Sequence, residues 1–344
     1  MVIFAVLTCD EPLIIEERFL EMRRKTLGKL LYYLLHATGF VLLYFVLRNF
    51  DWESFGALFQ TFRPIDFILG FTMLSVVYIL KSLRWMLINR TFDIHLPYGT
   101  TFIYFLVAGF LSVITPGRLG EFSRIFFIQR KTNISTTMAT SSVVLDRVWD
   151  VLVLSLLGGI SALMIFGRFQ LNTLTILAIA GFFLLALTVI LFPALIFIPL
   201  KKIFRKKGKL VTEMDSIQTV WGNNAGRLFI PGFLTTLIAF LALAVIPIIF
   251  TYRIGQDIGM IHSISAVSIS NMLAFLPVTV GGFGTRELVF SEIWKILEFS
   301  RESAITISTA YFICNYFGSV IFGGTTYLVW FRKHFSLKEL RKEG

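Results

Sequence analysis

Long apolar runs alternate with short charged segments along this chain. About 20 consecutive apolar residues are enough for a helix to cross the hydrocarbon core of a bilayer. Six runs close to this length cover residues 30–47, 65–80, 143–166, 171–199, 228–252 and 303–331. The pattern predicts an all-α polytopic membrane protein with about six full transmembrane helices.

Two further apolar runs, residues 98–115 and 259–280, each end at a break rich in Gly. The first run meets the break at residues 116–121, in which Pro116 is the expected hinge, and the second meets the break at residues 281–287. Neither arm is long enough to cross comfortably, so we expect two re-entrant hairpins, although two short crossings fit the charge pattern equally. Unwound backbone at membrane depth is tolerated where it lines a cavity.

The composition excludes a water-soluble enzyme, because 56% hydrophobic and 15% charged residues differ from the roughly 45–50% and 25% usual in soluble domains. The formal charge of +11 is typical of the positive-inside rule and does not indicate nucleic-acid binding. With both termini placed in the cytoplasm, seven of the 32 Lys and Arg residues fall outside, namely Arg48, Arg63, Arg168, Arg253, Arg286, Lys295 and Arg301. This bias predicts an integral cell-membrane protein with cytoplasmic N- and C-termini.

The chain divides into a cytoplasmic amphipathic segment at 1–29, a transmembrane domain at 30–331 and a basic cytoplasmic tail at 332–344. The halves of the domain, about 30–166 and 171–331, contain the same four elements in the same order, beginning from opposite sides. We therefore expect an inverted repeat. Inverted repeats with helices broken at corresponding positions indicate a transport site near the bilayer midplane.

The first break carries residues suited to binding an anion. Gly117 and Gly120 let the chain turn and would present free backbone N–H groups at a helix start, where the helix dipole favours negative charge. Arg118 and Arg124 add positive charge, and a guanidinium binds phosphate through two hydrogen bonds. Glu121 could pair with either arginine or bind a cationic headgroup. An anionic phospholipid or a polyprenyl phosphate would suit this site.

The run that follows contains Asp146, Arg147 and Asp150, and charge inside a membrane span tends to be functional or paired. The i to i+4 spacing of the two aspartates places both carboxylates on one helix face. They either balance Arg118 and Arg124 across the cavity or mark the cytoplasmic end of their helix. The sequence leaves both interpretations open.

The second break repeats the chemistry of the first. Pro277 ends its apolar arm as a second hinge, and the turn and charged helix start that follow contain Gly281, Gly282, Gly284, Arg286 and Glu287. The alternative is a plain extracellular loop. Asn271 would form hydrogen bonds either in the cavity or between helices. Arg84 and Trp85 follow the second span and are expected at the membrane interface.

Four motifs together resemble the lysylphosphatidylglycerol synthase transmembrane family, the flippase-like domain of the bacterial multiple peptide resistance factor. They are Arg84-Trp85, residues 116–121, residues 146–150 and Pro277 with residues 281–287, and the likeness covers roughly residues 30–331. The resemblance implies inverted helical halves with re-entrant helices, and movement of a lipid or lipid-linked headgroup between leaflets. Asp146 stands where the family more often has Glu. Because no aminoacyl-transferase domain follows Phe331, lysine transfer is not expected.

The favoured function is a lipid translocator that passes a phospholipid or lipid-linked anionic headgroup through a central cavity. No Walker sequence occurs, so ATP hydrolysis is not expected to drive it. The alternatives are an ion-coupled small-molecule transporter, a membrane enzyme with Glu121, Asp146 or Asp150 as base, and an accessory subunit of a separate synthase or transferase. Membrane lipids are the expected partners, a homodimer stays open, and neither a cofactor nor a metal site is expected.

Overall fold

The computed structural model describes residues 51–113, 115–132, 134–166, 208–275 and 284–331, with isolated positions between 177 and 198. Each regular element in this part of the chain is a helix. The elements are α2 (Trp52–Gln60), α3 (Pro64–Thr91), α4 (Tyr98–Val113), the 3-10 helix η1 (Pro116–Phe122), α5 (Ser123–Thr132), α6 (Thr136–Phe166), α9 (Gly208–Arg253), α10 (Gly259–Phe275), α11 (Thr285–Ile296), α12 (Arg301–Phe312), the π-helix η2 (Ile313–Phe317), α13 (Gly318–Thr326) and the π-helix η3 (Tyr327–Phe331).

Four helices among the described residues are long and apolar enough to cross a membrane. They cover Pro64–Thr91, Thr136–Ile165, Gly226–Arg253 and Arg301–Val329. These helices coincide with four of the predicted spans, which confirms a helical polytopic membrane protein. The predicted spans at 30–47 and 171–199 and the terminal segments 1–29 and 332–344 lie outside the described residues.

Helix α9 is longer than the hydropathy pattern indicates. The polar stretch before the apolar run at 228–252 is continuous with that run in one helix of 46 residues. Ile217 and Trp221 are buried on this extension, and the Trp221 ring stacks on Phe92 with 6.4 Å between ring centroids. Most helices in proteins are stabilised by the packing of an apolar stripe. The helix therefore continues through this polar stretch, because the stretch has such a stripe.

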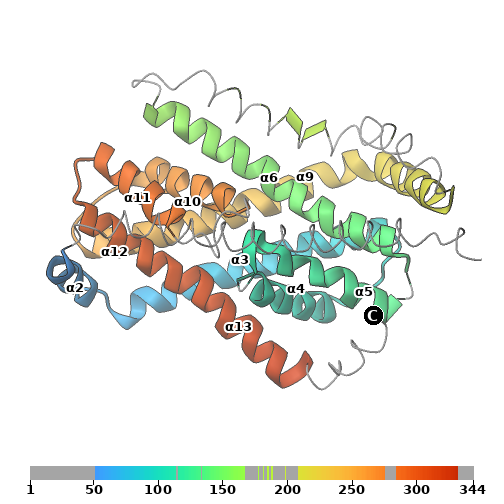
Figure 1. Ribbon diagram of the computed structural model, residues 1–344, viewed down its shortest axis with the longest axis horizontal. Helices are drawn as coiled ribbons and strands as arrows, with labels where there is room; N and C mark the ends of the chain where they lie inside the picture. The colour runs from blue at the N-terminus through green and yellow to red at the C-terminus, as the bar shows by residue number, and fades with distance from the viewer. Residues whose placement is uncertain are drawn as a thin grey trace, which may run out of the picture.

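The two predicted halves pack against each other element by element. Helices α3 and α9 lie side by side, α10 packs on α6, and α13 packs on α4. In Figure 1, α9 crosses α6 and α13 crosses α3 in projection. An ion pair joins the start of α3 to the end of α9, because Arg253 Nη2 and Nε lie 2.7 and 2.9 Å from the two oxygens of Asp66. Helices from both halves therefore surround the centre of the protein.

The contact between α4 and α13 depends on a glycine. A Cβ atom added to Gly323 would lie 2.3 Å from the carbonyl oxygen of Leu106, a backbone atom that cannot move aside alone. Small residues allow such close approach between helices in membranes. Gly222 on α9 has no heavy atom within 4 Å of the corresponding position.

We expect Gly323→Ala to lower the free energy of unfolding by about 1–3 kcal/mol, because overpacking forces the helices apart. The matched change Gly222→Ala should be neutral or stabilising by up to about 1 kcal/mol, because alanine favours helix. Thermal unfolding of both purified variants in the same detergent measures the difference. Equal melting temperatures would show that α13 does not pack on α4 at this distance.

Candidate functional site

The first break is a tight 3-10 turn held by its own side chains. Apolar helix α4 ends at Val113, and α5 begins only at Ser123, after η1. Thr115 Oγ1 accepts a hydrogen bond from the Gly120 N–H at 2.7 Å and donates to the carbonyl of Leu111 at 3.0 Å. The expectation that Gly120 presents a free N–H group to an anion is therefore wrong. Glycine is needed here for close packing, since a Cβ would lie 2.2 Å from the Leu111 carbonyl carbon.

Arg118 projects from this turn toward the second half of the chain. Its backbone is left-handed, with φ at 57°, which costs a non-glycine residue roughly 1–2 kcal/mol. Its Nη2 donates to Asn271 Oδ1 at 3.0 Å and to the Tyr316 hydroxyl at 3.2 Å. Asn271 also donates to the Tyr311 hydroxyl at 3.1 Å. Strained backbone persists where the surroundings fix it, often at functional sites.

Arg84 lies at the centre of a buried charged network. Its Nε donates to Asp146 Oδ1 at 2.8 Å and its Nη1 to Asp150 Oδ1 at 2.9 Å, so the i to i+4 carboxylates do face the same partner. Arg84 Nη1 also donates to the Thr236 hydroxyl on α9 at 2.6 Å. Lys81, one turn earlier on α3, places its Nζ 3.1 Å from Asp150 Oδ1.

Arg84 and Trp85, which are expected at the membrane interface, are 1% and 0% exposed and contact other protein groups. Trp85 Nε1 donates to the Ser142 hydroxyl at 3.2 Å. Both residues lie inside the protein because carboxylates more than 60 residues later in the chain satisfy Arg84. Their place at the end of an apolar run did not reveal that pairing.

Arg124 and Arg147 complete the network around Asp146. Arg124 Nη1 and Arg147 Nη2 donate to Asp146 Oδ2 at 2.8 and 2.7 Å. Arg147 also forms ion pairs with Glu121 and, at 2.9 Å, with Asp150 Oδ2. Arg124 therefore compensates the charge of Asp146, as the interpretation of balanced charges across the cavity predicted. Arg118 instead donates hydrogen bonds to Asn271 and Tyr316.

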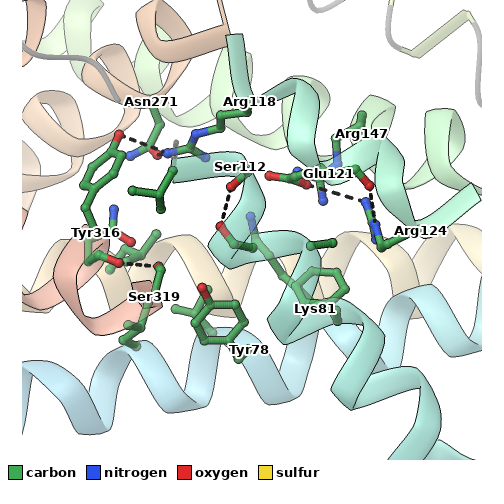
Figure 2. A pocket seen from close by; sticks show the side chains of 18 residues that line it. Tyr78, Lys81, Ser112, Arg118, Glu121, Arg124, Arg147, Asn271, Tyr316 and Ser319 are labelled. Atoms are coloured by element: carbon green, nitrogen blue, oxygen red, sulfur yellow. Dashed lines mark hydrogen bonds and ion pairs between the residues drawn. The ribbon is translucent and has the colours of Figure 1, made fainter. Parts of the chain in front are cut away.

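A cavity of about 70 Å³ lies between this network and Arg118. Figure 2 shows Arg118 and Asn271 on one side of it and Arg147 and Glu121 on the other. Its polar lining residues are Tyr78, Lys81, Ser112, Arg118, Glu121, Arg124, Arg147, Asn271, Asn315, Tyr316 and Ser319. One water needs about 10–15 Å³ by this measure, so the cavity holds several waters or a small polar group.

The charged helix start after the second break lies close to the same cavity. Arg286 and Glu287 form a buried ion pair, and Glu287 Oε2 accepts from the Gly284 N–H at 2.8 Å. The guanidinium carbon of Arg286 lies 5.6 Å from the centroid of the Tyr316 ring, and that of Arg118 lies 5.7 Å from it. Of the remaining predicted site residues, Pro116 and Gly117 begin η1, while Pro277, Gly281 and Gly282 lie outside the described residues.

Sequence reasoning missed Lys81, Asn315 and Tyr316, all of which line the cavity. Lys81 precedes Arg84 by three residues, a spacing that puts both on one helix face. Asn315 is a polar residue in the middle of the last apolar run, and such residues are commonly functional or interhelical. The sequence therefore contained a pattern that indicated each of these residues, but it did not show that Lys81 and Asn315 line the same cavity.

Comparison with known proteins identifies the family. The model of the lysylphosphatidylglycerol synthase TM region matches residues 30–323. The chain belongs to this family, which confirms the resemblance drawn from the motifs. It is also similar to a UPF0104 membrane protein of Methanocaldococcus jannaschii, with 24% identity over 231 residues that cover 64% of this chain and 94% of the relative.

Replacing Arg84 by methionine should lower the free energy of unfolding by about 3–5 kcal/mol, because the change removes a fully buried cation that binds both Asp146 and Asp150. Arg90→Met alters an exposed arginine of the same helix and should leave stability nearly unchanged. Thermal unfolding and gel filtration in detergent compare the two variants. A stable, monodisperse Arg84→Met protein would contradict the assignment of this network as the structural centre.

Proposed function

We propose that this protein moves an anionic lipid headgroup between membrane leaflets without hydrolysing ATP. The observation that carries the proposal is the lining of the cavity. Four cationic side chains, Lys81, Arg118, Arg124 and Arg147, face it together with one carboxylate, Glu121. Charge inside a membrane is costly, so a cavity lined in this way suits an anionic passenger. Guanidinium groups bind phosphate oxygens in pairs, which favours a lipid phosphate.

The packing of the halves supports a transport cycle. In the two halves, α3 is equivalent to α9, α4 to α10 and α6 to α13. Exchanging the halves therefore turns the contact of α4 with α13 into the contact of α10 with α6, and leaves the contact of α3 with α9 unchanged. We propose that a two-fold axis in the membrane plane relates the halves, with six full spans, two re-entrant hairpins and both termini in the cytoplasm. Rocking of one half against the other would open the cavity to each leaflet in turn.

The cavity itself limits what enters it. A volume of about 70 Å³ accepts a phosphate-sized group but not acyl chains. The chains would stay in the bilayer while the headgroup crosses, and the shape seen here would be one state of the cycle. The family and its UPF0104 relative fit a lipid-related membrane role.

An enzymatic role receives less support from the geometry. Asp146 and Asp150 hold guanidinium groups and do not line the cavity, and the lining carboxylate of Glu121 binds Arg147. A general base must reach the proton that it removes. In the described part of the chain, no three His, Cys, Asp or Glu side chains are grouped to hold a metal ion.

The first test measures leaflet exchange in liposomes that contain the purified protein. Fluorescent phosphatidylglycerol, phosphatidylethanolamine and a polyprenyl phosphate are compared. We expect the protein to accelerate exchange of an anionic lipid. Arg118→Ala should reduce that acceleration at least tenfold, because it removes a cation that faces the cavity. Glu121→Ala should reduce it to a similar extent, because it breaks the ion pair that positions Arg147.

Arg90→Ala serves as the matched control, since Arg90 is exposed. Circular dichroism and gel filtration establish that each variant is folded. Failure of folded wild-type protein to move any of these lipids would reject the translocator and favour an ion-coupled transporter or an accessory subunit. Normal exchange in both cavity variants would reject the site.

A further inference from the structure

The charges around the cavity do not balance. The cluster contains five cationic side chains and three carboxylates, an excess of two positive charges. Its members are Lys81, Arg84, Arg118, Arg124 and Arg147 with Glu121, Asp146 and Asp150. Arginine keeps its proton in proteins, so four of the five positive charges are fixed. An excess of charge in a low-dielectric region is unfavourable unless an anion neutralises it.

Around the cluster, the described residues of the second half do not supply the missing negative charge. Arg286 and Glu287, the nearest charged pair of the second half, neutralise each other. Residues 22–50, 167–207 and 276–283 contain no Asp or Glu, so these parts of the membrane domain have no carboxylate to contribute. Within the described residues, the cluster therefore keeps its excess of two positive charges.

The wall of the cavity opposite the ion pairs is neutral and polar. Opposite the ion pairs, the second half contributes neutral amide and hydroxyl groups from Asn271, Asn315, Tyr316 and Ser319. Such groups suit additional phosphate oxygens.

We propose that the group bound here is a phosphate monoester rather than a phosphodiester. This inference rests on the proposed function and names its substrate class. A monoester carries about −1.5 to −2 at pH 7, which matches the excess of two positive charges, whereas a diester carries a single negative charge. The monoester also ends in three free oxygens and has no second substituent. Lipids of this class include phosphatidic acid and polyprenyl phosphates, and a soluble source would be inorganic phosphate.

The experiment compares monoester and diester in the same liposomes at pH 7.4. Exchange of phosphatidic acid and of a polyprenyl phosphate is measured against exchange of phosphatidylglycerol, with uptake of radiolabelled inorganic phosphate as a separate arm. We expect the monoester lipids to exchange at least tenfold faster than phosphatidylglycerol. At pH 5 this advantage should shrink severalfold, because the second ionisation of a monoester has a pKa of about 6 and the protonated form carries one charge.

Removing one positive charge from the wall tests the same idea through the protein. Lys81→Gln leaves an excess of one charge and should reduce the monoester preference severalfold toward unity. Lys131→Gln, which alters an exposed lysine at the end of α5, should leave the preference unchanged. The ratio of two lipids within one preparation does not depend on how much variant inserts.

Each outcome separates this inference from the proposed function. Phosphatidylglycerol exchange as fast as monoester exchange would overturn the monoester assignment and leave a lipid translocator. Uptake of inorganic phosphate with no lipid exchange would support the monoester site and overturn the lipid as its source. No transport of any probe by folded protein would overturn both.

Discussion

The structure depends on the compensation of charge buried in a membrane domain. Asp146 is fully buried, and its carboxylate accepts hydrogen bonds from Arg84, Arg124 and Arg147. Those three arginines come from α3, α5 and α6. Because removing any one partner leaves an uncompensated charge, the network fixes these helices relative to one another and holds the first break in place beside the cavity.

The two sides of the cavity differ in how strongly their groups are already bound. On one side, Arg124 and Arg147 form buried ion pairs with carboxylates. On the other, Arg118 reaches across from a left-handed turn to the neutral groups of Asn271 and Tyr316. An arriving phosphate would replace neutral partners of Arg118 with a charge-assisted hydrogen bond, which is the stronger interaction. Arg118 therefore links the ligand site to the contact between the halves.

The fold was largely accessible from the sequence, whereas the site was accessible only in part. Gly and Pro interrupt an apolar run at residues 116–121, which predicted a break in the helix. The structure has this break. Asp146 and Asp150 contact the same partner because helix periodicity places residues i and i+4 on one face. Lys81 was missed, and Arg84 and Trp85 were placed at the interface, because charge at the end of an apolar run has the same pattern whether it meets headgroups or a distant carboxylate.

The sequence by itself thus determined which segments are apolar helices and where they break, because helix periodicity and backbone flexibility are properties of neighbouring residues. Its motifs also identified the family. The tertiary structure alone decided which charges meet. Arg84 finds Asp146 and Asp150 more than 60 residues away, and Arg118 finds Tyr316 198 residues away. Long-range pairing depends on helix packing in three dimensions, and so the cavity and its excess positive charge became visible only in the folded protein.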